Sequence, residues 1–537
     1  MVNENDRSAR LGQIHGDSAP HLLDPYRGDR VTLRKGERGS SPDEWNWVIS
    51  GDVDSTSDVE PTSFTKKEEH DVVSRLDRRL VLFVALLYML SFLDRSNLGN
   101  AKAAGLETDL GLSGVQFHWI LDGFYVTYIL FEFMTICYRI FPPHKYIAAC
   151  IAAMGAIAAL QSVATSFTAM LMLRLCLGIA EAAFGPGIPF YLSFFFKRDE
   201  LARRTGIFIA AAPLASSFAG SLAWLILRFA QGSSIDGWRL LFIAEGFPNM
   251  LLAVVAWYII PDTPGSASWL SAREQKIAAL RLRTPTHNSK PIHRSASSTK
   301  PHSLDWRAAA QTLRDPKSYL LASILFALNI SFSSLPVFLP TIVRNMGFSS
   351  LAAQGLSAFP NLFAFIVVLA TAALSDRYKS RSVPLIVHAL AAATGYAVLA
   401  TCPQMPEPAR YACLFPLTAG FFSAVTMVIV WTINNQVSDE GKAVGSSVLQ
   451  VFGHVGSLVG QQLYSDVEAP YYSWSHGVCA LFMLLAAALA LVLRVVLGRA
   501  NRRGGGHGNG SEEEEFEEAL MGGMGVYAPE RRFEYIL

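Results

Sequence analysis

Asp94 and Arg95 stand side by side at the far end of the first long apolar run of the chain, in Leu80–Asn97. An ionisable pair inside a membrane span is costly, and by default it marks a substrate or proton pathway. The planar fork of an arginine can hold a carboxylate through two parallel hydrogen bonds. The pair therefore predicts a membrane protein that moves a small solute.

Two more charged residues lie in the fourth apolar run. Asp94 is about 21 Å along a helix from Leu80, and Arg174 is about 7 Å from the outer end of a helix that runs the opposite way. These depths nearly match, so we expect an ion pair between Asp94 and Arg174. Glu181 follows Arg174 by almost two turns and shares its face. Arg95 is turned by about 100° from Asp94, so it can face a cavity.

These four charged residues also have two structural interpretations that involve no transport. They can form a static ion network, or Asp94 and Arg95 can anchor the first span at the outer interface. A transport role predicts instead that Asp94 stays ionised until its pair with Arg174 breaks, and that Glu181 takes up a proton more easily.

The elements that position these residues are long apolar segments. The chain has 537 residues, of which 51% are hydrophobic and 17% are charged, and about 20 apolar residues cross a bilayer as a helix. The twelve runs of this kind are Leu80–Leu93, Phe117–Cys137, Tyr146–Thr165, Ala169–Phe194, Gly206–Leu227, Leu240–Ile260, Tyr319–Ile342, Leu351–Leu374, Val383–Thr401, Tyr411–Ile433, Ala443–Leu463 and Trp474–Leu497. Because Leu80–Leu93 is short, we expect the first span to continue past Asp94 and Arg95.

The predicted fold is an all-α membrane protein with twelve transmembrane helices in two pseudo-symmetric six-helix bundles. Five parts follow from this count: a largely disordered tail at 1–79, a first bundle at 80–260, a linker at 261–316, a second bundle at 317–498 and a tail at 499–537. Within the linker, Trp269–Arg283 has a helical pattern and is expected to lie along the membrane surface.

Lysine and arginine gather on the flanks that include both tails and the linker. The positive-inside rule therefore places both termini in the cytoplasm, and we expect a multi-pass protein of the plasma membrane that works as a monomer. The net charge of +1 gives no reason to expect nucleic-acid binding. The sequence contains no phosphate-binding loop of the Walker type, no metal-ligand cluster and no hydrolase elbow. We therefore predict no enzyme, cofactor or metal.

Polar residues elsewhere are candidates for gating and binding. Asp376, Arg377 and Arg381 connect spans eight and nine, where an acid followed by basic residues can lock two helices; ordinary positive-inside anchoring would look the same. Tyr125, Asn434 and Asn435 are predicted to contact the substrate.

Two further features of the spans bear on the cavity. His454 in span eleven can titrate near neutral pH, although a single histidine on an apolar face is more often a packing residue. Gly185-Pro186-Gly187 and Pro189 predict a break in span four just past Glu181.

Several of these segments resemble the anion:cation symporter branch of the major facilitator superfamily, notably its fungal allantoate, nicotinate and pantothenate permeases. The matching segments are Leu93–Ala101, Arg174–Ala182 with Pro186-Gly187, Gly237-Trp238-Arg239, Pro261–Pro264 with Trp269-Leu270, and Asn434-Asn435 leading to Gly441-Lys442. The resemblance implies proton-coupled transport of a small organic anion by alternating access. It makes Asp94 and Glu181 proton carriers and Arg95 the carboxylate clamp, and it gives Arg174 the role of holding the protonation network.

Three functions compete at this level. The first is uptake of an organic carboxylate driven by protons. The second is export of an acidic secondary metabolite on the same fold, in which low external pH stimulates efflux instead of uptake. The third is a nutrient sensor that binds ligand without transport, and it would need a signalling element in one of the tails. Neither tail contains a recognisable domain, so the sensor ranks last. Uptake is the function we predict, with export as the alternative on the same fold.

Overall fold

The computed structural model describes residues 21–23, 30–38, 45–50, 64–230, 235–283, 306–348, 350–436, 438–464, 468–505 and 535–537. The chain forms two units, Met1–Phe64 and Thr65–Leu537. In the first unit, β1 (His21–Leu23), β2 (Arg30–Arg38) and β3 (Trp45–Ser50) make an antiparallel sheet in the order β1-β2-β3. This sheet lies in the range that we predicted as a tail. The rest of that range up to residue 63, the linker residues 284–305 and the tail residues 506–534 fall outside the described residues.

The second unit begins with helix before the first predicted span. Thr65 and Glu68 form a capping box that starts α2 (Lys66–Leu76). The helix continues through the π-helical segment η1 (Asp77–Val81) into α3 (Leu82–Ala103). Asp94 and Arg95 therefore lie inside a helix that runs on past them, as predicted.

The other helices of the first half follow the predicted spans two to six. Span two is α5 (Gly114–Phe131), the 3-10 segment η2 (Glu132–Ile136) and α6 (Cys137–Ile140), and it follows the short α4 (Leu106–Asp109). Span three is α7 (Pro143–Gln161), and span four is α8 (Phe167–Phe184) with α9 (Gly187–Leu192). Spans five and six are α10 (Leu201–Ala230) and α11 (Gly237–Ile259). The interruption between α8 and α9 is the break predicted at Gly185-Pro186.

The second half contains six long helices, which follow a connection made of shorter helices. The connection holds the 3-10 segment η3 (Pro264–Ser266), α12 (Ala272–Arg283) and α13 (Trp306–Arg314). The long helices are α14 (Pro316–Asn345), α15 (Ser350–Tyr378), α16 (Ser382–Thr401), α17 (Glu407–Asn434), α18 (Asp439–Gln461) and α19 (Ser473–Gly505).

Length and composition identify these helices as membrane spans. Among the described residues, ten helical segments are long and apolar enough to cross a bilayer, and α14 is an eleventh that bends by 49°. The twelfth is α3, whose 22 residues include Asp94, Arg95 and Lys102. At 1.5 Å per residue, 22 residues reach about 33 Å, enough for the hydrocarbon core.

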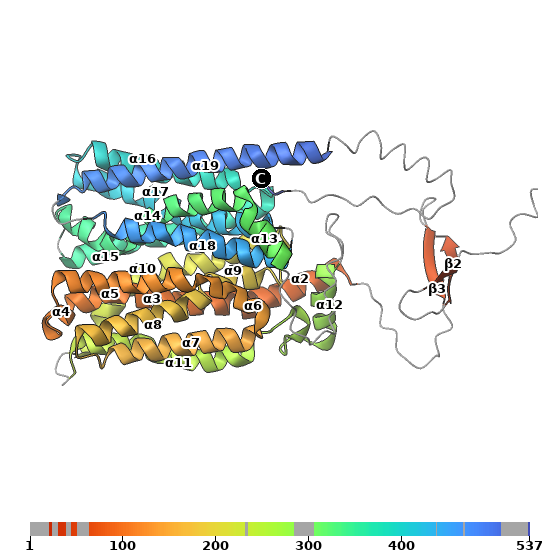
Figure 1. The fold of residues 1–537 in the computed structure, drawn as a ribbon, viewed down its shortest axis with the longest axis horizontal. Coiled ribbons are helices and arrows are strands. Elements are labelled where there is room, and N and C mark those ends of the chain that lie inside the picture. The colour runs from red at the N-terminus through yellow and green to blue at the C-terminus, as the bar shows by residue number, and fades with distance from the viewer. Residues whose placement is uncertain are drawn as a thin grey trace, which may run out of the picture. The chain divides into compact units, whose positions relative to one another are not determined.

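The two halves repeat the same helix pairing. In the first half α3 packs against α10, α5 against α8, and α7 against α11; in the second, α14 packs against α18, α15 against α17, and α16 against α19. These are spans 1–5, 2–4 and 3–6 in each half, so the six-helix bundles are pseudo-symmetric. The bundles meet along α10 with α15 and along η2 and α5 with α18. Figure 1 shows the two bundles side by side, the first in red to yellow-green and the second in green to blue.

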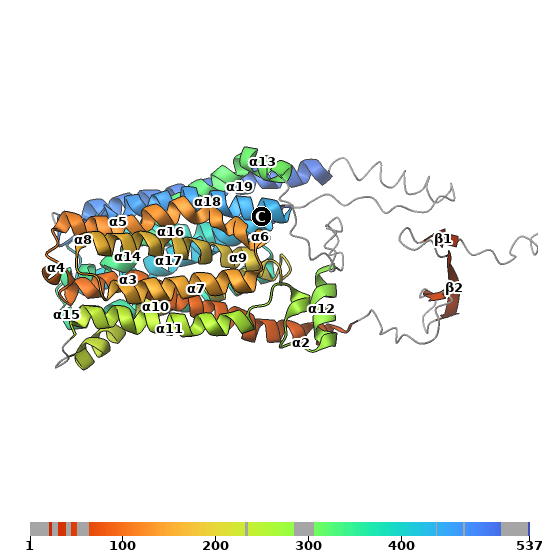
Figure 2. The ribbon, with the colours of Figure 1, turned by 60° about the horizontal axis from the view of Figure 1, so that its bottom comes forward.

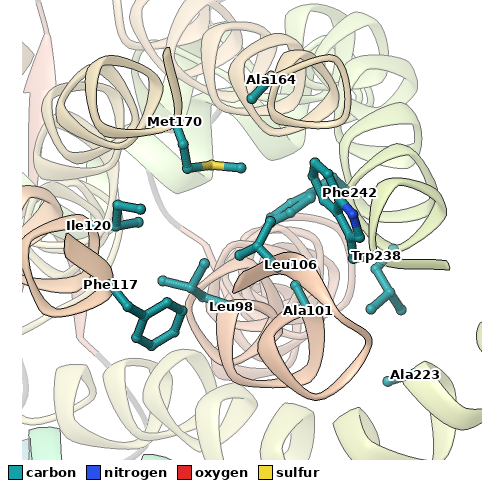
Figure 3. Packing of buried hydrophobic residues seen from close by; sticks show 11 residues of the cluster. Leu98, Ala101, Leu106, Phe117, Ile120, Ala164, Met170, Ala223, Trp238 and Phe242 are labelled. Atoms are coloured by element: carbon teal, nitrogen blue, oxygen red, sulfur yellow. The ribbon is translucent and has the colours of Figure 1, made fainter. Parts of the chain in front are cut away.

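The ends of the helical unit differ. One end, here called the α12 end, carries α2 and α12, whereas α4 lies at the opposite end in both views (Figures 1 and 2). At the α4 end, apolar side chains of six helices gather around Leu98, Leu106 and Phe242 (Figure 3). This apolar cluster packs α3, α4, α5, α8, α10 and α11 together at that end.

Ion pairs fasten α12 to the bundle. Arg281, whose side chain is fully buried, binds Glu200 at 2.6 Å and Glu69 at 3.2 Å, and Lys197 binds Glu69 at 2.7 Å. Partial burial of Glu69 works against its ionisation, but the hydrogen bonds and charges of Lys197 and Arg281 outweigh it and lower the pKa of Glu69. Helix α12 therefore docks on α2 and on the connection between α9 and α10.

Candidate substrate cavity and gate

Arg95 and Glu181 form an ion pair between α3 and α8. The Arg95 Nε donates to Glu181 Oε1 at 2.7 Å, and the Ser91 hydroxyl donates to the same oxygen at 2.7 Å. The exposed fraction of the side chain is 11% for Arg95 and 1% for Glu181. Gly178 allows the close packing behind this pair, since a Cβ there would lie 2.2 Å from the Thr127 hydroxyl of α5.

The guanidinium of Arg95 is surrounded by aromatic rings. Its Cζ lies 4.8 Å from the centre of the Tyr128 ring, 5.4 Å from that of Phe124 and 5.9 Å from that of Phe92. These distances are within the range of cation–π attraction. Its Nη2 is buried and has no hydrogen-bond partner in the described part of the chain. Arg95 thus uses one donor on Glu181, whereas Nη2 is left as an unused donor among the described residues.

Asp94 has different partners from those we predicted. Asn249 of α11 donates to Asp94 Oδ2 at 3.4 Å, and Glu245 of the same helix also contacts Asp94. Arg174 interacts electrostatically with Asp94, Glu181 and Glu245, and its Cζ lies 5.8 Å from the Phe242 ring. No Asp94–Arg174 ion pair occurs among the described contacts. The reason is that α11 packs against α3, and its Glu245 and Asn249 reach Asp94 from a direction that sequence spacing did not consider.

A small cavity lies between the halves beside Arg95. Its volume is about 40 Å³, which suffices for a few water molecules. The first half lines it with Arg95, Tyr88, Tyr128, Gly185, Pro186, Pro189, Phe208 and Ile209, and the second with Leu325, Asn329, Phe332, Val425, Ile429, Gln450 and His454. A solute larger than a few water molecules therefore needs one end of the protein to open before it can enter.

Asp376 and Arg381 link the two halves at the α12 end. The carboxylate of Asp376 accepts from the main-chain N–H of Ala202 at 3.2 Å and from that of Arg203 at 2.7 Å, both in α10. Arg381, fully buried, binds Asp376 at 2.7 Å, and it donates to the Arg198 carbonyl at 3.3 Å. Arg377, which we grouped with them, is exposed. The predicted gate residues Asp376 and Arg381 thus meet the first half, and this end is closed.

Asn434 and Asn435 belong to the same closed end. Asn434 donates to the Arg198 carbonyl at 3.0 Å, and Arg198 donates to the Asn434 carbonyl. Asn435 exchanges hydrogen bonds of 3.0 and 2.8 Å with the main chain of Ile536. Both were predicted to contact substrate, but they are not among the cavity-lining residues. They form the last turn and C-cap of α17, whose middle part passes the cavity.

The last two features of the site are the predicted substrate residue Tyr125 and the contact between the halves at the α4 end. Tyr125 packs edge-on against Phe124 at 5.1 Å and interacts electrostatically with Arg95, but it does not line the cavity. Near it, Gln462 donates to Asp122 at 3.1 Å between the two halves. The cavity is therefore bridged at both ends.

Several buried polar residues in or near the cavity were not identified from the sequence. Glu132 and Glu245 are acids inside apolar runs, a signal that marks function by default, and both are buried. Asn329 and Gln450 also line the cavity. Single amides in membrane helices commonly serve as interhelical hydrogen-bond partners, so nothing in the sequence singled them out.

Comparison with known proteins agrees with this architecture. Residues 84–461 match the family model of the Major Facilitator Superfamily. The chain is 30% identical to the MFS transporter prlL of a fungal species (strain NRRL 50135), over 80% of this chain and 87% of that one. It is 29% identical to the MFS-type transporter cnsO of Penicillium expansum, over 88% of this chain and 91% of that one.

Solved structures share the fold. The proton:xylose symporter XylE aligns with a TM-score of 0.56 at 16% identity, over 76% of this chain and 94% of that one. The human organic anion transporter MFSD10 aligns with a TM-score of 0.54 at 14% identity, over 77% and 99%. The twelve helices in two pseudo-symmetric bundles predicted from the sequence are thereby confirmed.

Proposed function

Because the chain belongs to the Major Facilitator Superfamily, we propose that it is a proton-coupled carrier that takes up a small organic carboxylate by alternating access, within the anion:cation symporter branch. Transport itself agrees with the relatives, which are named as transporters. The substrate class, the coupling ion and the direction are the steps taken beyond those names.

The observation that carries the proposal is the state of Arg95. One nitrogen binds Glu181 at 2.7 Å, while Nη2 is buried beside the cavity and has no hydrogen-bond partner among the described residues. Leaving a charged donor unsatisfied is expensive, and a carboxylate that enters the cavity would satisfy it. The aromatic walls suit the carbon body of such an anion.

The coupling between proton binding and anion binding follows from the Arg95–Glu181 ion pair. When Glu181 is ionised it attracts Arg95, and when it takes a proton that attraction falls, so the guanidinium is free to hold the substrate carboxylate. Proton and anion thus promote each other's binding. Asp94, beside Glu245 and Arg174, is the second proton carrier, and Arg174 holds this protonation network.

Alternating access uses the two closed ends. The Asp376–Arg381 gate holds the α12 end, which we place in the cytoplasm with both termini on the positive-inside rule. The carrier is assigned to the plasma membrane and acts as a monomer. Breaking the gate would release the substrate inward.

The test is uptake of radiolabelled small carboxylates by cells that express the protein. The proposal expects at least one acid to accumulate faster at low external pH, and the amide of the same acid not to be taken up. Arg95→Lys should lose that uptake, whereas Arg377→Lys, a change at an exposed site, should retain it. Efflux of preloaded acid stimulated by low external pH would establish export instead. Binding without flux would establish a sensor.

A further inference from the structure

Glu132 is a buried carboxylate with no role in the mechanism above. It begins η2, where span two changes from α-helix to 3-10 helix, and its side chain is fully buried. Its carboxylate contacts Nδ1 of His454 in α18, and that histidine side chain is 10% exposed. The two residues belong to different halves. The histidine that looked solitary in the sequence therefore has an acidic partner across the interface.

The two interfaces between the halves are built differently. Along α10 and α15 the contact is tight, since a Cβ on Gly206 would lie 2.4 Å from that of Ala372, and its polar part is Asp376 on the main chain of Ala202 and Arg203. Along η2 and α18, Ile136 packs on an apolar cluster that includes Val444 and Val448. Glu132 and His454 thus place two ionisable side chains in the same interface as this apolar cluster.

The other groups around Glu132 and His454 do not compensate the charge of Glu132 in place of His454. From α3, Arg95 acts on Glu132, but it is already bound to Glu181 of α8. From α5, the Tyr128 ring lies edge-on to His454 at 5.0 Å. The residues of α14 and α17 that line the cavity are Leu325, Asn329, Phe332, Val425 and Ile429, and none of them ionises. His454 is therefore the nearest compensating partner of Glu132.

We propose that Glu132 and His454 form a proton-binding site that holds the two halves together while it carries one proton and loosens them when the proton leaves. With one proton, the pair is neutral overall, either as carboxylate and imidazolium or as acid and imidazole. Without it, a buried carboxylate faces a neutral ring, which is unfavourable in the low-dielectric interior. The released proton goes to water. This site rests on the proposed function, to which it adds a second place where protons control access.

The test measures the distance between the halves and needs no substrate. The purified chain, with its six native cysteines replaced, carries spin labels at Ile140→Cys and Tyr378→Cys, two exposed positions at the ends of α6 and α15. Electron–electron resonance distances are recorded in lipid nanodiscs from about pH 5 to about pH 9, around the usual range of histidine. The closed population should fall as the pH rises, by at most about tenfold per pH unit for one proton.

Variants separate this pair from other titrating groups. Glu132→Gln and His454→Gln should each flatten the titration, and the double variant should add nothing further, because both remove one interaction. His388→Gln is the matched control, since His388 binds Thr371 at 2.7 Å within the second half. It should titrate like the unchanged protein. A wild-type titration in His454→Gln would overturn the proposal.

An exchange of the two residues guards against variants that fail to fold. Glu132→His combined with His454→Glu keeps one acid and one imidazole in contact and should restore the titration. A folded exchange variant with a flat response would contradict the proposal. Failure of the uptake test would refute the proposed function and leave this distance titration intact. Proton-driven uptake with the same pH profile in His454→Gln would instead refute only the proton site.

Discussion

The two halves share one helix pairing but place their charges at different depths. In the first half Arg95 lines the cavity and belongs to one buried charge network with Glu181, Asp94 and Arg174. In the second half Asp376 and Arg381 lie at the α12 end, and the cavity wall is made of apolar residues, amides and His454. Pseudo-symmetry of the helices therefore does not extend to their chemistry. On our proposals, the first half binds the anion and the coupling proton, whereas the second half supplies the closing contact and a cavity wall whose one ionisable residue is His454.

The largest effect is expected from breaking the gate. Asp376→Ala leaves Arg381 buried without its carboxylate, and losing one partner of a buried ion pair costs about 3–5 kcal/mol. The closed α12 end should become the minor state. Labelling of Ile429→Cys, a cavity position, by a membrane-impermeant thiol reagent applied from that side should increase strongly. Arg377→Ala, at the exposed neighbouring residue, is the control and should leave labelling unchanged.

Arg95→Lys should weaken binding of the anion without comparable loss for a neutral analogue. A lysine cannot reproduce the planar fork that serves Glu181 and a carboxylate together. Loss of a charge-assisted contact costs about 1.5–3 kcal/mol, or roughly a ten- to hundred-fold rise in Kd. Binding of the acid and of its amide to purified protein measures both values. Similar losses for the two ligands would indicate a structural role for Arg95.

Substitutions of uncharged residues in the cavity wall of the second half should have smaller effects. Gln450→Ala removes one uncharged hydrogen-bonding group of the second half, worth about 0.5–1.5 kcal/mol. The expected loss of affinity is about two- to tenfold. Acid and amide should lose equally, because no charge is involved. A loss as large as that in Arg95→Lys, and confined to the acid, would show that the division between the halves is wrong.

The smallest effect concerns Glu69, outside the cavity. Its lowered pKa means that it stabilises the docking of α12 above its ordinary pKa of 4.5, and that this contribution disappears as the pH falls through the lowered value. A partly exposed pair contributes up to about 1 kcal/mol. Glu69→Gln should increase hydrogen exchange in α12 at neutral pH and remove its dependence on acid pH. Transport should change little.

The sequence predicted the helices well and the contacts less well. All twelve apolar runs became helices because length and hydropathy suffice to define a span. The break at Gly185-Pro186 also followed from residue type. Partners across helices did not, since two depths matched by 1.5 Å steps do not specify which neighbour packs there. Glu245 took the place beside Asp94 that had been expected for Arg174.

The contacts that a residue makes also depended more on its position along the helix than on its residue type. Asn434 and Asn435 were assigned to the substrate because amides suit a cavity, yet they end α17 at the gate. His454 looked solitary because Glu132 is more than 300 residues away in sequence and meets it only through the pairing of η2 with α18.

The most direct test of the central claim compares two kinds of transport in Glu181→Gln. Purified protein in liposomes is assayed with a carboxylate found in the uptake screen, once under an inward proton gradient and once as exchange at equal pH. Glutamine mimics the protonated acid but cannot release a proton. The account predicts that Glu181→Gln retains exchange and loses accumulation driven by the gradient. Accumulation equal to that of the unchanged protein would contradict the role of Glu181, and with it the assignment of coupling to the first half.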